Sequence, residues 1–305
     1  MPDQGGALAF ATLDVFTDGA FSGNPLAVVL DADGLTTDAM QTIAREFNLS
    51  ETIFVQRPAD PANTAKVRIF FPTAEIPFAG HPTIGCALYL AQRMHGEGDI
   101  DTVLRLEEEA GLVPVRVWCE NGARWAELTA PVVPHAATRG TTPPADLLAR
   151  AIGLGRDAIG FGTHAPAVWE GGPRFLYIPV GSLDALAEAR PHEPTWSETM
   201  TRAAVDSAYL YTPLPQGGYR ARMFSPTAGI PEDPDTGSAS AILAAQLLAS
   251  GDLAEGETRV TLQQGVEMGR PSRIALRILT KGGALDAVHV AGQAVDISDG
   301  RIRHP

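Results

Sequence analysis

The chain contains one stretch of sequence twice, and this repetition limits its fold more than any other feature. RIFFPTAEIP (68–77) and RMFSPTAGIP (222–231) are identical at seven of ten positions and begin 154 residues apart, close to half of the 305-residue chain. Each copy leads from a strand-like segment through a proline-rich turn and a glycine-containing loop into an apolar helix. A solenoid repeat is much shorter than this. The repeat therefore predicts two similar domains joined in tandem.

The helices that follow the two copies are expected to be deeply buried. TIGCALYLAQRM (83–94) and ASAILAAQLLAS (239–250) carry apolar residues around most of their circumference, which is typical of a helix surrounded by protein. By contrast, TDAMQTIAREFN (37–48) has one apolar face and either Thr36 or Thr37 as N-cap. This pattern predicts a helix that covers a domain from outside.

Most of the remaining segments alternate between apolar and polar residues with a period of two, which predicts strands. They are KVRIFF, TVLRLE, LVPVRVW, ARWAEL, RVTLQ, RIALRIL and AVHVAGQAVDI. Asn121-Gly122 lies between two of them and is a strong hairpin signal. The composition of 131–144 (PVVPHAATRGTTPP) is typical of an interdomain connection. The pattern alone leaves open whether the last strand stays in the second domain or returns to the first.

The charge and composition exclude several classes of partner. A net charge of −13 argues against nucleic acid or an anionic membrane surface, because both require clustered Lys and Arg. No segment approaches the eighteen apolar residues of a membrane span. The opening MPDQGGALAF has no basic region typical of a signal peptide, so we expect a cytoplasmic protein. Cys86 and Cys119 lie far apart and indicate neither a disulfide framework nor a zinc site.

Common cofactor motifs give no support to a nucleotide-dependent or metal-dependent enzyme. Gly153, Gly155 and Ala158 formally match a dinucleotide-binding fingerprint, but they follow the helical stretch ADLLARAI instead of a strand, so the match is expected to be accidental. The sequence contains no nucleophile elbow, no Walker loop and no zinc-binding helix. The expected cofactor and metal content is none.

Two loops form the candidate site, IPFAGHPTIG (76–85) and IPEDPDTGSA (230–239). Each lies just before the N-terminus of a buried helix, where free backbone N–H groups and the helix dipole attract anions. Gly80 and Gly237 let a ligand approach this backbone closely. Two such helix ends facing one another are expected to bind a carboxylate, even though the protein is acidic.

Each polar candidate also has an ordinary structural interpretation. Ser238 could simply cap its helix, and Asp233 could form a turn. Glu51, in the sequence Ser50-Glu51-Thr52 between a helix and a strand, could be a surface carboxylate. The residue pattern alone does not separate these alternatives from functional roles.

The chain resembles the PhzF proteins of phenazine biosynthesis, which share the diaminopimelate epimerase-like fold. The matching stretches are DVFTDGAFSGNPLAVVLDADGL, IAREFNLSETIFV, RIFFPTAEIPFAGHPTIG, GGPRFLYIPVGSLDAL, RARMFSPTAGIPEDPDTGSASA and LQQGVEMGRPS. The resemblance implies an α+β fold of two pseudo-symmetric domains, 1–130 and 131–289, each a barrel-like β-sheet around a central buried α-helix. It also implies that the last strand, about 290–305, returns to the first domain, that the active site lies between the domains, and that the protein is a homodimer.

The resemblance assigns roles to residues of both candidate loops. The glutamate of the family's S-E-S/T motif is the acid/base, and it corresponds to Glu51. The implied substrate-binding residues are Asn24, Ser50, Gly80, His81, Asp233, Gly237 and Ser238. Pro234 and Asp235 stand where the family's isomerase has two alanines, and Asp235 could change the charge near the substrate.

The implied activity is a cofactor-independent isomerisation in which a proton moves between carbons of a small cyclic amino acid, as in trans-2,3-dihydro-3-hydroxyanthranilate. One alternative is an isomerase or epimerase acting on another amino- or hydroxy-acid. A second is a non-catalytic protein that binds a small carboxylate. Diaminopimelate epimerase has the same fold but needs a cysteine in each half, and Ala79 and Thr236 occupy those positions here. A two-thiol epimerase is therefore excluded.

Overall fold

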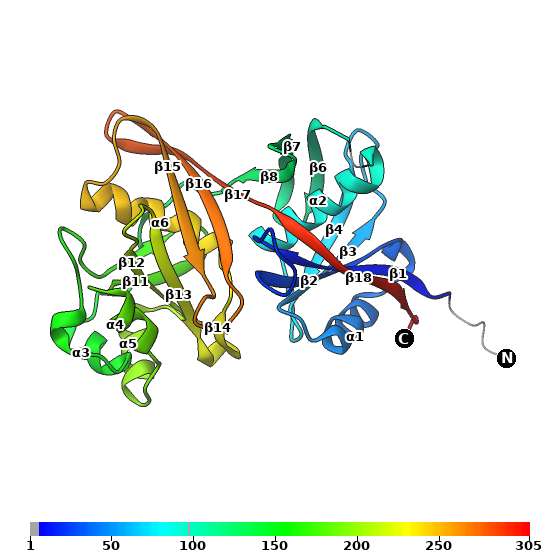
Figure 1. Ribbon diagram of the computed structural model, residues 1–305. Coiled ribbons are helices and arrows are strands. Elements are labelled where there is room, and N and C mark those ends of the chain that lie inside the picture. Colours follow the sequence, from blue (N-terminus) through cyan, green and yellow to red (C-terminus); the bar gives the residue numbers. More distant parts are fainter. Residues whose placement is uncertain (1–5, 97) are drawn as a thin grey trace. The chain divides into compact units, whose positions relative to one another are not determined.

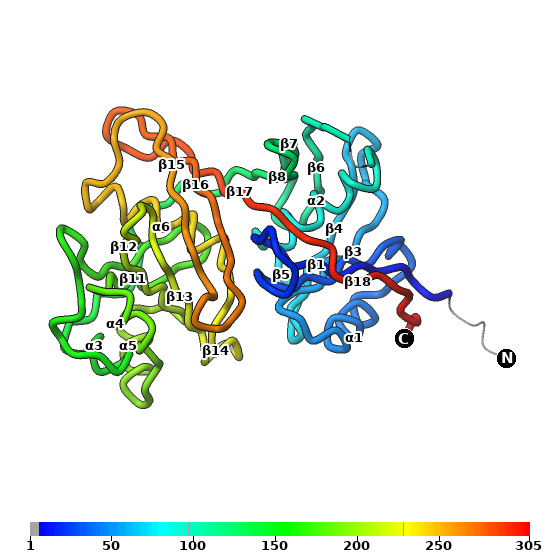
Figure 2. The backbone as a smooth tube through the Cα atoms, in the orientation of Figure 1, coloured from blue at the N-terminus to red at the C-terminus, as the bar shows by residue number. Residues whose placement is uncertain are grey.

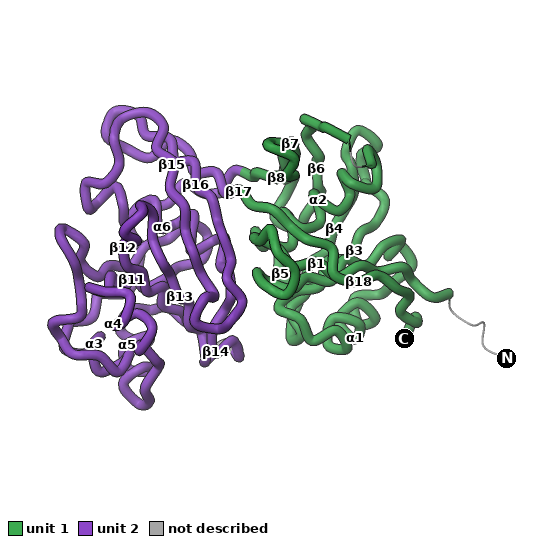
Figure 3. Tube along the Cα trace, viewed as in Figure 1, with its two compact units in different colours: residues 1–128, 291–305 green, residues 129–290 purple. Residues whose placement is uncertain are grey.

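The chain folds into two compact units in a computed structural model that describes residues 6–96 and 98–305. Unit 1 comprises the residues up to 128 together with 291–305, and unit 2 comprises 129–290 (Figure 3). The chain thus passes from unit 1 to unit 2 and back again. The expectation that no signal peptide precedes the fold depends partly on residues 1–5, which lie outside the described residues.

Unit 1 is a sheet that surrounds α2 (Figure 1). Its elements are β1 (Leu8–Val15), β2 (Asn24–Val29), η1 (Ala32–Gly34), α1 (Thr37–Phe47), β3 (Glu51–Gln56), β4 (Ala65–Phe70), β5 (Glu75–Ile76), α2 (Gly80–His95), β6 (Asp101–Glu108), β7 (Gly111–Glu120), β8 (Ala123–Thr129) and β18 (Ala294–Ile302). The pairs β2/β3 and β4/β6 are parallel. β1 runs antiparallel to both β2 and β18, so the last strand is built into the first unit (Figure 2).

In unit 2 the strands surround α6 (Figure 1). Its elements are β9 (His135–Ala136), α3 (Ala145–Ala151), η2 (Arg156–Ala158), β10 (Ala167–Glu170), β11 (Arg174–Pro179), α4 (Leu183–Glu188), α5 (Thr195–Ala203), β12 (Ala208–Pro213), β13 (Tyr219–Ser225), η3 (Pro226–Ala228), β14 (Ile230–Asp233), α6 (Gly237–Ser250), β15 (Gly256–Gln264), β16 (Ser272–Lys281) and β17 (Ala284–Gly292). Here β11/β12 and β13/β15 are the parallel pairs.

The two units repeat one topology, which confirms the predicted fold class. In unit 1, β4 begins at Ala65, which pairs in parallel with Leu106 of β6 after the chain has passed through α2. In unit 2, β13 begins at Tyr219, which pairs in parallel with Leu262 of β15 after the chain has passed through α6. Ala65 and Tyr219 are separated by the same 154 residues as the two copies of the sequence repeat.

The helix predictions are confirmed. α6 is buried along nearly its whole length, and α2 is buried through its first turns, although its last turn is exposed and includes Met94. α1 packs one face, including Met40 and Ile43, against the core of unit 1. The Thr36 side chain caps α1 by accepting a hydrogen bond of 3.2 Å from the backbone of Ala39.

Two strand-level expectations need correction. AVHVAGQAVDI is not one strand: β17 ends at Gly292 and β18 begins at Ala294, where the chain returns to unit 1. The intervening Gln293 accepts a backbone hydrogen bond of 2.7 Å from Phe16. The segment 131–144 is not a free connection either, because it contains β9, which pairs with β10 inside unit 2.

The dinucleotide-like motif lacks the structural context of a nucleotide site. The motif runs from Gly153, after α3, to Ala158, the last residue of the 3₁₀ turn η2. A dinucleotide fingerprint requires a strand followed by a helix.

The Asn121-Gly122 hairpin is confirmed, since both residues have positive φ angles, 52° and 76°. Within residues 6–96 and 98–305, no helix has the length and apolar character needed to cross a membrane.

Each unit holds its copy of the repeat with a bidentate arginine. In unit 1, Arg68 donates two hydrogen bonds, of 2.7 and 2.6 Å, to Glu75. In unit 2, Arg222 donates two hydrogen bonds of 2.8 Å to Glu232 and three more to carbonyl oxygens at the end of α4. Both guanidinium groups also lie against the phenylalanine two residues later in the strand. The Arg222 side chain is 1% exposed, compared with 21% for Arg68.

Candidate active site

Glu51 and His81 meet inside unit 1, although thirty residues separate them in the sequence. His81 Nε2 lies 3.3 Å from Glu51 Oε2, and their side chains are 4% and 10% exposed. Glu51 is the first residue of β3, and His81 is the second residue of α2. The structure thus brings together two of the predicted residues in a site that largely excludes water.

Close packing of α2 on the sheet sets this geometry. Leu26 of β2 is paired with Glu51, so the start of β3 lies beside the start of β2. Gly85 of α2 faces the same strands: a Cβ at this position would lie 2.6 Å from Leu26 and 2.7 Å from Val15. Because glycine has no Cβ, the helix can approach the sheet closely enough to bring His81 to Glu51.

The imidazole of His81 is uncharged at neutral pH. Burial lowers its pKa to about 3, although a hydrogen bond to the backbone of Pro25 acts in the opposite direction. Proline offers only a carbonyl oxygen, so the ring must donate its single N–H there. Since Nε2 faces Glu51, that donor is Nδ1, and Nε2 keeps a lone pair directed at the carboxyl group. The contact is therefore not an ion pair between charged groups.

Asn24 and Ser50 lie on the same two strand ends. Asn24 is the first residue of β2, is 1% exposed and pairs with Val15 of β1. Ser50 is half-buried and directly precedes Glu51. Both predicted residues thus belong to the strand ends that carry Glu51 and contact His81 through Pro25.

The turn before Asn24 requires a glycine. Gly23 has a φ angle of 66°, and a Cβ there would lie 2.2 Å from the carbonyl oxygen of Val15. We expect Gly23→Ala to lower the free energy of unfolding by about 2 to 4 kcal/mol, because it combines a left-handed backbone with a backbone clash. Gly19→Ala is the control, since its nearest contact would be an ordinary 3.7 Å, and it should stay within about 0.5 kcal/mol of wild type. Chemical denaturation measures both, and equal effects would contradict this account.

In unit 2, Asp233 is held at the end of β14. Its Oδ2 accepts a hydrogen bond of 2.7 Å from Thr236, and its carbonyl oxygen accepts one of 2.9 Å from the Gln264 side chain. Gln264 also donates to Thr236 Oγ1 at 3.0 Å. The buried Gln264 thus ties Asp233 to the residue that precedes α6.

Gly237 and Ser238 form the first turn of α6, and Gly80 and His81 form that of α2. The N-cap residues are Thr236 and Ala79, and neither side chain caps its helix within the described residues. Thr236 instead uses its hydroxyl on Asp233. Neither first turn thus receives a hydrogen bond from the side chain of its N-cap residue within the described chain, and anion binding by these backbone N–H groups stays a prediction.

Asp235, the departure noted in the sequence, is 1% exposed. Burial raises the pKa of Tyr209 beyond its usual range, and the charges of Asp235 and Asp233 act in the same direction. Tyr209 in turn lies 3.1 Å from Ser240 of α6. A buried acidic group thus lies beside the start of α6.

One polar residue of the repeated loops, Glu232, has a structural role. Glu232 binds Arg222, as described above, and is unavailable to a ligand. The cysteines do not occupy the two helix starts: Cys86 is buried within α2, where burial raises the pKa of its thiol strongly, and Cys119 lies in β7. Within the described chain, no three His, Cys, Asp or Glu side chains are grouped so that they could hold a metal ion.

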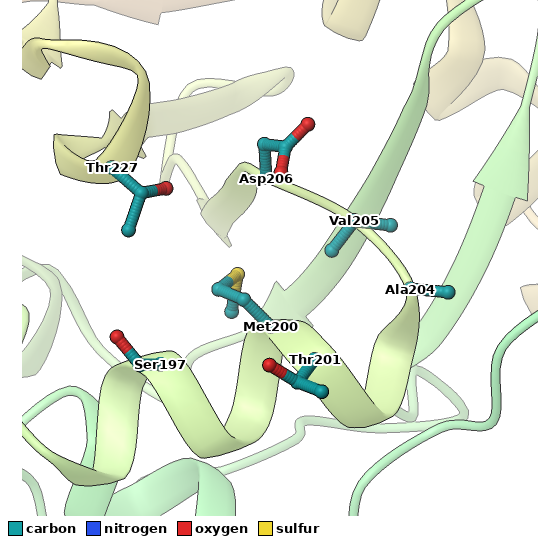
Figure 4. A pocket seen from close by; sticks show the side chains of 7 residues that line it. All are labelled: Ser197, Met200, Thr201, Ala204, Val205, Asp206 and Thr227. Atoms are coloured by element: carbon teal, nitrogen blue, oxygen red, sulfur yellow. The ribbon is translucent and has the colours of Figure 1, made fainter.

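A cavity of about 270 Å³ in unit 2 lies apart from all these residues (Figure 4). It is lined by Ser197, Met200, Thr201, Ala204, Val205, Asp206 and Thr227. Asp206 is the only charged group in this lining, and none of the predicted site residues belongs to it. We therefore assign it no role in the site.

Sequence reasoning missed Gln264 and Thr236 as supports of Asp233. Gln264 lies in LQQGVEMGRPS, a stretch that carries the family resemblance, but one glutamine at a strand end has no pattern of its own. Only the fold shows that it reaches Asp233, thirty-one residues earlier.

Comparison with known proteins agrees with the fold. The family model described as phenazine biosynthesis-like protein, PhzC-PhzF, matches residues 13–300. An uncharacterized isomerase of Mesorhizobium japonicum is 41% identical, with 95% of this chain and 96% of that protein covered. Trans-2,3-dihydro-3-hydroxyanthranilate isomerase of Pseudomonas aeruginosa is 36% identical, with 96% and 98% covered.

A solved structure extends the likeness to three dimensions. The crystal structure of a Bacillus anthracis phenazine biosynthesis protein of the PhzF family superposes with a TM-score of 0.86, at 25% identity, and covers 97% of this chain and 99% of that one. The sequence match, the shared fold and the named isomerases among the relatives agree with one another. The chain belongs to the PhzC-PhzF family of phenazine biosynthesis-like proteins and is a PhzF-like isomerase.

Proposed function

We propose that this protein is a cofactor-independent isomerase that moves a proton between two carbons of a small cyclic amino acid. The observation that carries the proposal is the buried pair of Glu51 and His81, whose atoms approach to 3.3 Å. A relative at 36% identity is named trans-2,3-dihydro-3-hydroxyanthranilate isomerase, and we propose this compound as the substrate, which would place the protein in phenazine biosynthesis.

Glu51 is the proposed proton carrier. As a carboxylate it removes the proton at C3, and as the resulting carboxylic acid it delivers a proton to C1, which leaves an enol that becomes a ketone. Every proton is thus conserved, and no oxidant or reductant is needed. His81 is a poor alternative carrier, because a group with a pKa of about 3 is far from the operating pH that favours acid–base catalysis. When Glu51 carries the proton, the Nε2 lone pair of His81 can accept a hydrogen bond from it and so orient the carboxylic acid.

The remaining predicted residues are proposed to bind the substrate. Backbone N–H groups of Gly80, Gly237 and Ser238 would bind its carboxylate, because they lie in helix first turns that no side chain caps within the described residues. Asp233 would bind its amino or hydroxyl group. Asn24 and Ser50, at the strand ends beside Glu51, would contact the substrate there.

This account predicts a specific effect at the start of α6. Gly237→Val should weaken binding of 2-aminobenzoate, an aromatic acid with the same amino and carboxyl groups as the proposed substrate, by about tenfold to a hundredfold. Arg116→Ala, which removes an exposed positive charge, should change the affinity less than twofold because such charges are strongly screened. Titration calorimetry tests both variants, and the reverse ranking would reject carboxylate binding by helix N-termini.

A different substrate is the second candidate. The relative at 41% identity is an uncharacterized isomerase, and the buried Asp235 stands where the resemblance leads us to expect alanine. An isomerase or epimerase acting on another amino- or hydroxy-acid would use the same Glu51 chemistry. A non-catalytic carboxylate-binding protein would show affinity without turnover.

One assay separates these candidates. Purified protein is incubated with trans-2,3-dihydro-3-hydroxyanthranilate in deuterium oxide, and the product is analysed by NMR. Turnover with deuterium at the receiving carbon supports the proposed reaction. Binding without turnover would favour another substrate or the non-catalytic alternative. We also propose that the protein is a cytoplasmic homodimer that binds neither nucleic acid nor membranes. Light scattering tests the dimer, and cell fractionation tests the compartment.

A further inference from the structure

The hydroxyl group of Thr83 lies between two oxygen atoms in unit 1. Thr83 is in α2 and fully buried, and its Oγ1 is 2.7 Å from the carbonyl oxygen of Ala79 and 2.6 Å from Oε1 of Glu108. A hydroxyl group has one proton to donate. Both short contacts can be hydrogen bonds only if one of the two oxygens carries a proton itself. A carbonyl cannot, so the proton must belong to Glu108.

The second oxygen of Glu108 supports the same conclusion. Glu108 ends β6 and is 9% exposed. Its Oε2 is buried and has no hydrogen-bond partner among residues 6–96 and 98–305. An ionised carboxylate oxygen in that position would lose its hydration without compensation, whereas a neutral carboxylic acid loses much less.

We infer that Glu108 is a positioning residue, held as the neutral carboxylic acid, whose proton fixes the first turn of α2 through Thr83. In this arrangement Glu108 donates to Thr83, and Thr83 donates to Ala79. Burial raises the pKa of Glu108 to about 7, although its hydrogen bond with Thr83 acts in the opposite direction. The proton is therefore held at pH 6 and lost by pH 8.

The groups around Glu108 leave its charge uncompensated. The titratable group facing it from α2 is the thiol of Cys86, whose pKa is raised strongly by burial and further by Glu108. From β7 its partner is Gly111. The preceding residue, Glu107, accepts a hydrogen bond from Asn63 and lies opposite Lys66 of β4. The following residue, Glu109, is close enough to Arg68 for its charge to raise the pKa of that arginine.

The functional consequence rests on the proposed function. Ala79 directly precedes Gly80 and His81, the residues proposed to bind the carboxylate and orient Glu51. When Glu108 ionises, the single proton of Thr83 is drawn to the new charge, and the carbonyl of Ala79 loses its hydroxyl donor. The first turn of α2 then loosens, and kcat/KM falls although no group that touches the substrate has titrated.

The test compares wild type with Glu108→Gln, whose amide can donate to Thr83 but cannot ionise. Wild-type kcat/KM should fall by about tenfold between pH 6 and pH 8, and Glu108→Gln should lack this fall. Glu109→Gln, at the exposed neighbouring position, is the matched control and should keep the wild-type profile. Identical profiles for wild type and Glu108→Gln would overturn the positioning role.

A second measurement does not depend on turnover. Since the folded state holds the proton of Glu108 more tightly than the unfolded chain, this group stabilises the protein fully below about pH 4.5, and the contribution is lost as the pH rises to about 7. Relative to Glu108→Gln, the wild-type unfolding midpoint should therefore fall by about 5 °C between pH 4.5 and pH 7.5. Parallel curves would show that Glu108 is already ionised and would overturn the inference. If this shift is seen but no isomerase activity, the proposed function fails while the protonated Glu108 stands.

Substitutions at Thr83 keep the inference testable if Glu108→Gln does not fold. Thr83→Ser retains the hydroxyl group and should keep the wild-type fall in kcat/KM between pH 6 and pH 8. Thr83→Val has nearly the same shape but no hydroxyl, so kcat/KM should be low already at pH 6 and nearly independent of pH up to pH 8. A Val variant with the wild-type profile would show that Glu108 does not act through Thr83.

Discussion

Replacing Glu51 with Gln should lower kcat by about ten-thousand-fold or more, because the variant keeps the shape of the side chain but has no group that can accept the proton. Affinity for 2-aminobenzoate should change only a few-fold, since Glu51 is proposed to act on the carbon-bound proton and not on the carboxylate. Single-turnover kinetics, with deuterium incorporation followed by NMR, measures the first quantity, and calorimetry measures the second.

The matched control for this experiment is Glu46→Gln, an exposed glutamate of α1 in the same unit. It should retain wild-type turnover. If Glu51→Gln converts substrate within a few-fold of wild type, Glu51 is a structural residue and the mechanism proposed here is wrong. If its activity is lost together with its fold, as seen by circular dichroism, Glu51→Asp provides the alternative, because it keeps the base but moves it away from His81.

The two arginines of the sequence repeat should respond very differently to the same substitution. Arg222→Met leaves Glu232 and three carbonyl oxygens without their buried partner, and we expect it to lower the free energy of unfolding by about 3 to 5 kcal/mol. Arg68→Met breaks the corresponding pair in unit 1, where both side chains are partly exposed. Its expected cost is about 1 kcal/mol.

Chemical denaturation of the two variants provides the comparison. Adding Glu232→Leu to Arg222→Met should recover part of the loss, because it removes the unpaired buried charge. Equal costs at the two arginines, or no recovery in the double variant, would show that burial does not govern the strength of these pairs.

The parts of the fold that were predictable from sequence are those encoded by nearby residues. The capping threonine of α1, the Asn121-Gly122 hairpin and the apolar circumference of α6 are all local signals, and the structure confirms them. The repeat at 68–77 and 222–231 extended these signals to the whole chain, because two similar segments imply two similar units.

Features that depend on distant partners were not predictable. The strand break at Gln293 arises where the chain returns to unit 1. There the carbonyl oxygen of Gln293 accepts a hydrogen bond from the backbone of Phe16. Likewise, 131–144 reads as a linker because its proline and glycine content is local, whereas the pairing of Ala136 with Trp169 is not.

The candidate site shows the same division. No sequence spacing indicates that Glu51 and His81 are in contact. The resemblance to the family's motifs, and not periodicity, identifies them as site residues. The contact between Thr83 and Glu108 was not predicted, because a threonine in a helix and a glutamate at a strand end carry no sequence signal. Only the fold shows that they are buried against one another.

The return of the chain to unit 1 has a consequence for how the protein is made. Unit 2 is one continuous stretch, 129–290, whereas Arg301 of β18 donates a hydrogen bond to the carbonyl oxygen of Ala7, 294 residues earlier. A ribosome adds about 5 to 20 residues each second. Synthesis of unit 2 therefore separates the appearance of unit 1 from that of β18, the partner of β1, by roughly 8 to 30 seconds. Unit 2 can therefore complete its sheet on the ribosome first, while unit 1 exposes the open edge of β1 to chaperones for that whole interval.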